Sequence, residues 1–275
     1  MGKLYFLVPF SLGLIAAYSY QHYALRRIHS PHKLYATIND TLKIPYGRQS
    51  IYGELITPKD HKADTLIIAS HGFNGSMTYF KQSLAYYLAQ EGYAFYAFDF
   101  INGSKHSKSG GKIENMSASD EVNQLKTVLD HFKKDYRHIV LAGESQGGLI
   151  TTLAYDECRE DANALILYYP AYCAPVEARK RLENKETSMF GFQIDSNYSE
   201  ELSKINVEEK IRKISVPTLL LHGDNDKTVD VSYAYRAKEL SPGIEMHILN
   251  GKDHGFDQEG RKKAAQYVGA FLKRL

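Results

Sequence analysis

The pentapeptide GESQG at residues 143–147 constrains this chain more than any other feature of its sequence. It follows a short apolar run, HIVLA at residues 138–142, and directly precedes a stretch with helical spacing at residues 146–158. In a Gly-x-Ser-x-Gly sequence between a strand and a helix, the serine occupies a tight turn, and the glycines let the backbones approach closely. The pattern predicts that Ser145 is a nucleophile at a sheet edge. It also predicts that the amide of Gln146, at a helix N-terminus, can donate to an oxyanion.

The chain from about residue 33 onward alternates strand-like and helix-like segments. Unbroken runs of apolar residues, such as TLIIAS at residues 65–70, indicate strands that are buried on both faces. Repeated β-α units form a mostly parallel, doubly wound sheet, and LYATI with SIYGELITP predicts an antiparallel hairpin before it. We expect strands at residues 65–70, 93–98, 138–142, 164–169, 217–221 and 245–249, and helices at residues 78–90, 118–134, 146–158, 232–240 and 260–272.

A long interruption follows the strand predicted at residues 164–169. Residues 171–213 are rich in charge and contain SMFGF and several tyrosines. Because long structureless loops are uncommon in compact domains, we interpret this segment as a small cap insertion over the carboxyl edge of the sheet. An ordinary surface excursion is the alternative. Residues 31–275 would then form one domain.

The first 30 residues form a separate hydrophobic segment. The 22 residues between Lys3 and Arg26 include no Asp, Glu, Lys or Arg. Their number is close to the roughly 20 residues that a helix needs to cross a bilayer. We interpret residues 1–30 as a hydrophobic helix that anchors the protein in a membrane. A signal peptide that is cleaved on secretion and a helix packed on the domain are the alternatives. The basic residues on the two sides nearly balance, so the orientation stays open.

A second loop with catalytic potential is SHGFNG at residues 70–75, which follows the first buried strand. Binding an oxyanion needs a second backbone amide from a loop after an earlier strand, and we assign that part to Phe73. His71 lies on the wrong strand for a base in this chain order. We expect it to be a buried, hydrogen-bonded loop residue.

Two later loops carry the other candidate residues. In HGDNDKTV, Asp224 and Asp226 compete as the carboxylate that orients a base. We favour Asp226, partly on the resemblance given below. We expect the Asp224 side chain to hydrogen-bond to the backbone in a turn and His222 to be structural. In NGKDHGF, His254 is the candidate general base. The resulting chain order Ser, Asp, His is the hydrolase order rather than either protease order.

Composition excludes several other classes of protein. The net charge of +2 gives no electrostatic footprint for nucleic acid. The two cysteines, Cys158 and Cys173, cannot build a disulfide framework and lack the spacing of a zinc site. We therefore expect no metal and no organic cofactor, while the oligomeric state stays open.

Together these segments resemble the α/β-hydrolase superfamily over roughly residues 33–275. Within it the chain looks like the serine hydrolases that include bacterial cinnamoyl or feruloyl esterases, monoacylglycerol lipases and serine-aminopeptidase-like members. The likeness to cinnamoyl esterases rests on Asp99-Phe100, GKIENMS at residues 111–117, SQGG at residues 145–148, and the HGxxD and DHGF segments. This resemblance implies an α/β-hydrolase fold with Ser145 as nucleophile, Asp226 as acid, His254 as base, and Phe73 and Gln146 as oxyanion amides.

The chain departs from that family in two places. Glu144 stands where these esterases usually carry His, and its negative charge is expected to shift the pH optimum. The loop after Asp99, FINGSKHSKSGG, is longer and more basic than the family pattern. That difference leaves the substrate contacts of the loop open.

The expected reaction is hydrolysis of a small carboxylic ester through an acyl-enzyme. Aromatic residues near the cap suit an apolar or aromatic acyl group, although packing in the core is an equal alternative; they are Tyr168, Tyr169, Tyr172, Phe190, Phe192 and Tyr198. A peptidase or amidase is the second hypothesis, with an acidic anchor for a substrate amine among Glu177, Glu183, Glu186 and Asp195. A monoacylglycerol lipase and a non-catalytic binding module are the others.

Overall fold

The computed structural model describes residues 34–275. The predicted hydrophobic helix at residues 1–30 lies outside these residues, and with it the predictions of a membrane anchor or a signal peptide. Across the described range, no helix combines the length and the apolar character needed to cross a bilayer.

One sheet of eight strands organises residues 34–275. Its order is β1-β2-β4-β3-β5-β6-β9-β10; β1 and β2 pair antiparallel, β2 pairs antiparallel with β4, and the other neighbours are parallel. The mostly parallel α/β sheet predicted from the sequence is confirmed. The strands are β1 (Thr37–Tyr46), β2 (Gln49–Pro58), β3 (Thr65–Ser70), β4 (Ala94–Phe98), β5 (His138–Glu144), β6 (Ala164–Tyr168), β9 (Thr218–Gly223) and β10 (Ile244–Leu249).

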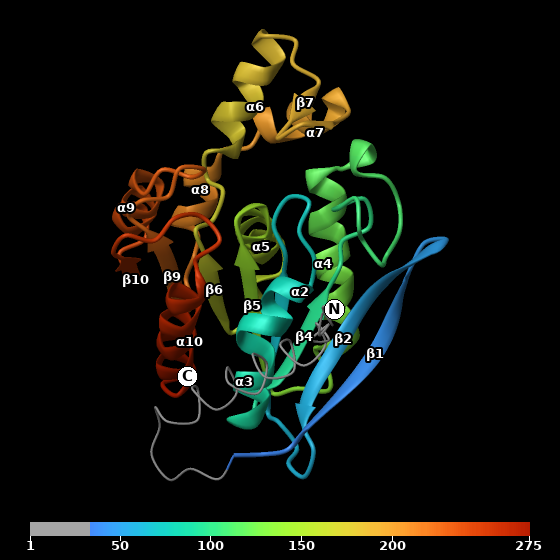
Figure 1. Cartoon of the computed structure of the whole chain (residues 1–275), viewed down its shortest axis with the longest axis vertical. Coiled ribbons are helices and arrows are strands. Elements are labelled where there is room, and N and C mark those ends of the chain that lie inside the picture. The colour runs from blue at the N-terminus through green and yellow to red at the C-terminus, as the bar shows by residue number, and fades with distance from the viewer. Residues whose placement is uncertain (1–33) are drawn as a thin grey trace, which may run out of the picture. The chain divides into compact units, whose positions relative to one another are not determined.

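Helices cover both faces of this sheet (Figure 1). Leu66 and Ile68 of β3 contribute to one buried cluster, whereas Ile67 and Ala69 contribute to the other. Alternate residues therefore face opposite layers, which is why the central strands are continuous apolar runs. One layer contains α4 (Ala118–Phe132), α5 (Gln146–Glu157) and α9 (Ser232–Leu240), and the other contains α2 (Thr78–Phe80), α3 (Tyr86–Gln90) and α10 (Gln258–Leu272).

Most predicted helices and strands differ from the structure by one or two residues at an end, and two differ by more. The helix expected at residues 78–90 contains a π-helical turn, Lys81–Ala85, between α2 and α3. Strand β1 begins at Thr37 and continues to Tyr46, well beyond LYATI, because it pairs with β2 along its whole length up to the turn at Gly47. Its residues are mostly solvent-facing. The alternation of apolar and polar residues therefore does not indicate how far this strand extends.

The segment after β6 forms a small helical layer of its own. It contains α6 (Ala174–Glu183), the short strands β7 (Ser188–Met189) and β8 (Phe192–Gln193), and α7 (Ser196–Ser203). Figure 1 shows α6, β7 and α7 set apart from the sheet, beyond the end of α4 that contacts α7. We call residues 174–203 the cap. The next helix, α8 (Val207–Arg212), packs on α5 and α9.

The turn between β5 and α5 depends on close backbone packing. A Cβ atom added to Gly147 would lie 2.3 Å from the carbonyl oxygen of Ser70 in β3. One added to Gly143 would lie 2.3 Å from the carbonyl oxygen of Gly147. Neither backbone can shift cheaply, so both glycines of the motif are needed for packing, independently of any chemistry.

We expect Gly147→Ala to lower the free energy of unfolding by about 3 kcal/mol, as overpacking of a tight site does. The matched control is Gly243→Ala, since a Cβ atom at Gly243 meets nothing within 4 Å, and its effect should stay within about 0.5 kcal/mol. Urea unfolding of both variants measures the difference. Equal stabilities of the two variants would show that the turn tolerates a side chain at position 147 and that close backbone packing there is not required.

Candidate active site

Ser145 is the single residue between β5 and α5, and its backbone is strained. Its φ of 53° and ψ of −119° lie outside the regions that residues with a side chain ordinarily adopt. Its amide donates to the carbonyl oxygen of Tyr168 at 2.9 Å, and its own carbonyl oxygen accepts from the amides of Gly148 at 3.0 Å and Ala171 at 2.8 Å. These bonds hold the turn in a conformation that presents the serine side chain at the sheet edge.

The structure brings Ser145, His254 and Asp226 together from three separate loops. The Nε2 atom of His254 lies 2.9 Å from the Oγ of Ser145. Its Nδ1 atom lies 2.8 Å from Oδ2 of Asp226. With Nδ1 protonated toward the carboxylate, Nε2 is free to accept the proton of the serine hydroxyl.

Asp226 is held as a buried anion by several donors. Its side chain is 0% exposed, and its Oδ1 accepts from the amides of Thr228 and Val229, each at 2.8 Å. Burial by itself raises the pKa of Asp226, but hydrogen bonds from His222, His254 and the Val229 amide outweigh it and hold the pKa well below its usual range. The carboxylate is therefore ionised at neutral pH and can stabilise a positively charged imidazole.

The two competing aspartates have separate positions. Asp226 contacts His254, whereas Asp224 accepts a hydrogen bond from the amide of Gly251 in the loop after β10. Asp253 in that loop accepts from the amide of Lys227 at 2.9 Å. These bonds join the loop of Asp226 to the loop of His254. His222 is fully buried, and its Nε2 lies 2.9 Å from the carbonyl oxygen of Val229.

The loop after β3 lies directly against the serine turn. A Cβ atom added to Gly72 would sit 3.0 Å from the Cβ of Ser145. His71 is buried, with Nδ1 2.7 Å from the Gly72 carbonyl oxygen and Nε2 accepting from the amide of Phe100 at 3.0 Å. Both ring nitrogens are used in holding the loop, as expected for a structural histidine.

The amides of Phe73 and Gln146 are available to a ligand. Gln146 is the first residue of α5, so its amide has no acceptor within the helix. No hydrogen bond formed among residues 34–275 uses the amide of either residue. An oxyanion hole requires backbone amides of this kind, without an acceptor in the folded protein and close in the chain or the fold to the nucleophile.

Glu144 has a role that its position in the sequence did not reveal. Its Oε1 accepts the amide hydrogen of Gly72 at 2.7 Å, and the residue is only 8% exposed. It therefore fastens the loop of Phe73 to the serine turn. The only sequence feature that could have indicated this hydrogen bond is an acidic residue at the end of a buried strand. The expected effect of its charge on the pH optimum stays a prediction.

Tyr169 is a second contact that sequence analysis missed. Its ring centroid lies 4.5 Å from that of His254, and its hydroxyl donates to the Tyr79 hydroxyl at 2.7 Å. Arg261 stacks over the Tyr79 ring and donates to the carbonyl oxygens of Gly255 and Phe256, which directly follow His254. This side of the imidazole is therefore closed by packed aromatic rings.

The aromatic residues expected near the cap divide into two groups. Four of them, Tyr168, Tyr169, Tyr172 and Tyr198, are buried and pack inside the protein, as the alternative interpretation predicted. The other two come from the β7–β8 hairpin and contact Phe73, with ring centroids 5.7 Å away for Phe190 and 5.9 Å for Phe192. We call Phe73, Phe190 and Phe192 the aromatic cluster.

The chain is similar in sequence to several known proteins. The family model described as serine aminopeptidase, S33 matches residues 61–203. Among curated proteins, Lipase 3 of Moraxella sp. strain TA144 is 29% identical over 111 residues, which are 39% of this chain and 33% of the lipase. The chain thus spans about a third of the length of that relative. An uncharacterized peptidase, YtmA, of Bacillus subtilis is 21% identical over 67% of this chain and 74% of its own length.

Solved structures show the same fold. Est1E of Butyrivibrio proteoclasticus with bound ferulic acid has a TM-score of 0.75 and 24% identity, over 84% of this chain and 99% of that chain. The Pyrococcus furiosus esterase Pf2001 has a TM-score of 0.64 and 25% identity, over 86% of this chain and 91% of that chain. The α/β-hydrolase fold predicted from the sequence is confirmed for the described residues.

Asp226 is expected to make the fold acid-sensitive. Because folding lowers its pKa, its ionised form stabilises the protein above the pKa of a free aspartate, about 4, and this stability is lost as the pH falls further. Wild-type protein should therefore lose stability more steeply below pH 4 than Asp226→Asn. Thermal unfolding at a series of pH values measures the slopes, with Asp224→Asn as the matched exchange that keeps the wild-type slope. Identical slopes for Asp226→Asn and wild type would contradict the buried-anion assignment.

Proposed function

The chain belongs to the serine aminopeptidase S33 family, and we propose that it is a serine hydrolase that cleaves carboxylic esters through an acyl-enzyme on Ser145. The observation that carries the proposal is the continuous contact from Ser145 through His254 to Asp226, at 2.9 and 2.8 Å. Hydroxyl, imidazole and buried carboxylate in this order convert an alcohol into a nucleophile.

The positions of these groups support the following reaction. Nε2 of His254 takes the hydroxyl proton as Oγ of Ser145 attacks the ester carbonyl carbon. The imidazolium, stabilised by Asp226, then gives that proton to the leaving alcohol as the ester C–O bond breaks and the acyl-enzyme forms. In the second half, His254 takes a proton from water, the hydroxide adds to the acyl carbon, and the proton returns to Ser145 as the acid leaves.

The negative charge of each tetrahedral intermediate would be held by the amides of Phe73 and Gln146. Neither amide has a hydrogen-bond partner within the part of the chain that the structure describes, and the Gly72–Phe73 segment is tied to the serine turn through Glu144. Fixed donors of this kind stabilise the transition state without reorganising during the reaction. Phe73 would thus contribute its amide to the oxyanion and its ring to the aromatic cluster.

The substrate class that fits best is a small ester with an apolar or aromatic acyl group. The aromatic cluster places three phenyl rings at the residue that supplies one oxyanion amide, and Phe190 is 69% exposed. An exposed ring of this size beside a reaction centre provides a surface on which another ring can stack. Est1E, which shares the fold, has been solved with ferulic acid bound.

The alternatives receive less support from the side chains. Of the cap acids considered as anchors for a substrate amine, Glu177 pairs with Lys180 at 2.9 Å and Asp195 caps α7 through the amide of Asn197. Glu183 and Glu186 are exposed. None of these four is a buried, unpaired carboxylate, which disfavours an aminopeptidase. The monoacylglycerol lipase alternative depends on the proposed N-terminal membrane anchor, because such an enzyme would act at the bilayer to which it is attached.

Replacing Ser145 by Ala should abolish turnover of p-nitrophenyl butyrate, with a loss of at least about 10,000-fold, because the nucleophile is removed. Thermal unfolding of Ser145→Ala controls for the fold. A panel of short acyl, long acyl, monoglyceride and hydroxycinnamate esters, with an aminoacyl nitroanilide alongside, measures the specificity. Retained esterase activity in Ser145→Ala would remove the assignment, and faster cleavage of the anilide than of every ester would replace it with the peptidase.

A further inference from the structure

The side chain of Gln146 connects the catalytic core to the cap. Its Nε2 donates to Oε2 of Glu121 in α4 at 2.7 Å, and its Oε1 accepts from the hydroxyl of Tyr198 in α7 at 2.6 Å. All three residues are buried. Gln146, whose backbone amide is proposed to bind the oxyanion, is thus bonded through its side chain to both a core helix and a cap helix. The mechanism proposed above uses neither Glu121 nor Tyr198.

Glu121 is unusual because its carboxyl group forms no ion pair with any Lys, Arg or His of residues 34–275. It is 1% exposed, and its Oε1 has no hydrogen-bond partner among the described residues. This oxygen lies close to the loop after β4: a Cβ atom added to Gly103 in that loop would be 3.3 Å from it and 3.1 Å from Cε1 of His71. Burying a carboxyl oxygen without a hydrogen-bond partner costs free energy. Such a group in a folded protein therefore calls for an explanation, and a functional role is one.

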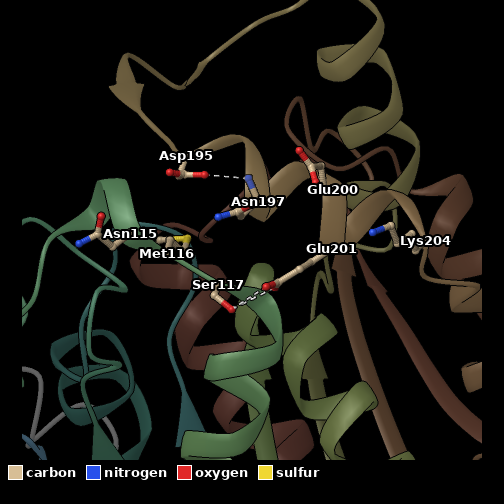
Figure 2. A pocket seen from close by; sticks show the side chains of 8 residues that line it. All are labelled: Asn115, Met116, Ser117, Asp195, Asn197, Glu200, Glu201 and Lys204. Atoms are coloured by element: carbon tan, nitrogen blue, oxygen red, sulfur yellow. Dashed lines mark hydrogen bonds between the residues drawn. The ribbon is translucent and has the colours of Figure 1, made fainter. Parts of the chain in front are cut away.

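The other end of the connection is a cap helix that is fixed to the core. Glu201 of α7 accepts from Oγ of Ser117 and from the amide of Ser119, each at 3.0 Å, at the start of α4. Figure 2 shows this contact beside a cleft of about 360 Å³, lined by Asn115, Met116, Ser117, Asp195, Asn197, Glu200, Glu201 and Lys204. Met116 in that lining also receives a hydrogen bond from Nε2 of Gln146 at 3.2 Å. The position of α7 is therefore transmitted directly to Gln146.

We propose that Glu121 and Tyr198 are positioning residues that hold Gln146 so that its backbone amide points at the oxyanion. The inference rests on the proposed function and deepens it. If Glu121 or Tyr198 is replaced, the Gln146 side chain loses its hydrogen bond to α4 or to α7. The first turn of α5 is then less firmly fixed. Because oxyanion stabilisation depends on donors that are already oriented, the loss falls on the chemical step rather than on substrate binding.

The protonation state of Glu121 supports this role. Burial raises the pKa of Glu121 to about 8; the hydrogen bond from Gln146 opposes this, and the nearby charges of Asp120 and Glu201 add to it. His71 lies near this carboxyl group in the loop after β3, and its Nε2 atom accepts a hydrogen bond from the amide of Phe100 rather than donating one to Glu121. At neutral pH, Glu121 is mainly a neutral acceptor for Gln146. Above pH 8, an ionised and partly unpaired carboxylate would favour leaving its buried position and releasing Gln146.

The test compares four variants by steady-state kinetics on p-nitrophenyl butyrate and by the rate of labelling with a fluorophosphonate probe. Glu121→Ala and Tyr198→Phe should each lower kcat and the labelling rate by about tenfold, since loss of a complete oxyanion donor costs about 100-fold or more. KM should change less than about twofold. Glu121→Gln, which keeps an acceptor for Gln146, should restore most of kcat at pH 7.

Tyr172→Phe is the matched control for Tyr198→Phe. The Tyr172 hydroxyl is equally buried and lies 2.9 Å from Oγ1 of Thr152, away from Gln146, so its loss should affect stability without affecting kcat. The pH profile adds a readout that a purely structural role would not change. Wild-type kcat should decline above about pH 8, as the titration of Glu121 requires, and this decline should be absent in Glu121→Gln.

Ser145→Ala, measured in parallel, separates this proposal from the proposed function. If Ser145→Ala is labelled by the probe, the proposed function fails. If Ser145→Ala is inert but Glu121→Ala and Tyr198→Phe react like wild type, only the positioning role is overturned. A drop in kcat for Tyr172→Phe as large as for Tyr198→Phe, or the same alkaline decline in Glu121→Gln and wild type, would also overturn it.

Discussion

The strained backbone of Ser145 is the constraint on which the rest of the structure depends. A residue with a side chain pays about 1–3 kcal/mol to adopt such a conformation. It persists because β3, β5 and β6 surround it: Gly143 and Gly147 allow the backbones to meet, and Tyr168 and Ala171 bond to both polar groups of Ser145. The same packing that stabilises the fold therefore aims the hydroxyl at the sheet edge, where the loops of a parallel sheet converge.

The other components of the site are fastened to this turn or to one another. Glu144 links the turn to the loop of Phe73, and Gln146 links it to α4 and to the cap. The loops of Asp226 and His254 are joined through Asp224 and Asp253. A displacement in one loop is thus shared by its neighbours. In the proposed reaction, this arrangement would hold Ser145, His254 and Asp226 in contact, and positioned groups of this kind accelerate a reaction.

Sequence analysis succeeded where the signal was local. Strand β3 and helix α9 match their predicted bounds, because an apolar run or a helical period lies within a few residues. Choosing Asp226 over Asp224 needed position in the loop together with a family resemblance. The contacts of Gly72 with Glu144, of Tyr169 with His254, and of Gln146 with Tyr198 join residues 52 to 85 positions apart. No periodicity encodes such contacts, since they arise only when the sheet order brings the loops together.

The central claim is that an acyl group is transferred to Ser145 by the action of His254. Its most direct measurement is mass spectrometry of protein quenched with acid during turnover of p-nitrophenyl acetate, followed by peptide mapping. The account predicts one added acetyl group, carried by the peptide that contains Ser145, and little of this species when His254 is replaced by Ala. Acetyl groups found only elsewhere, or equal acetylation of Ser145 with and without the imidazole, would contradict it.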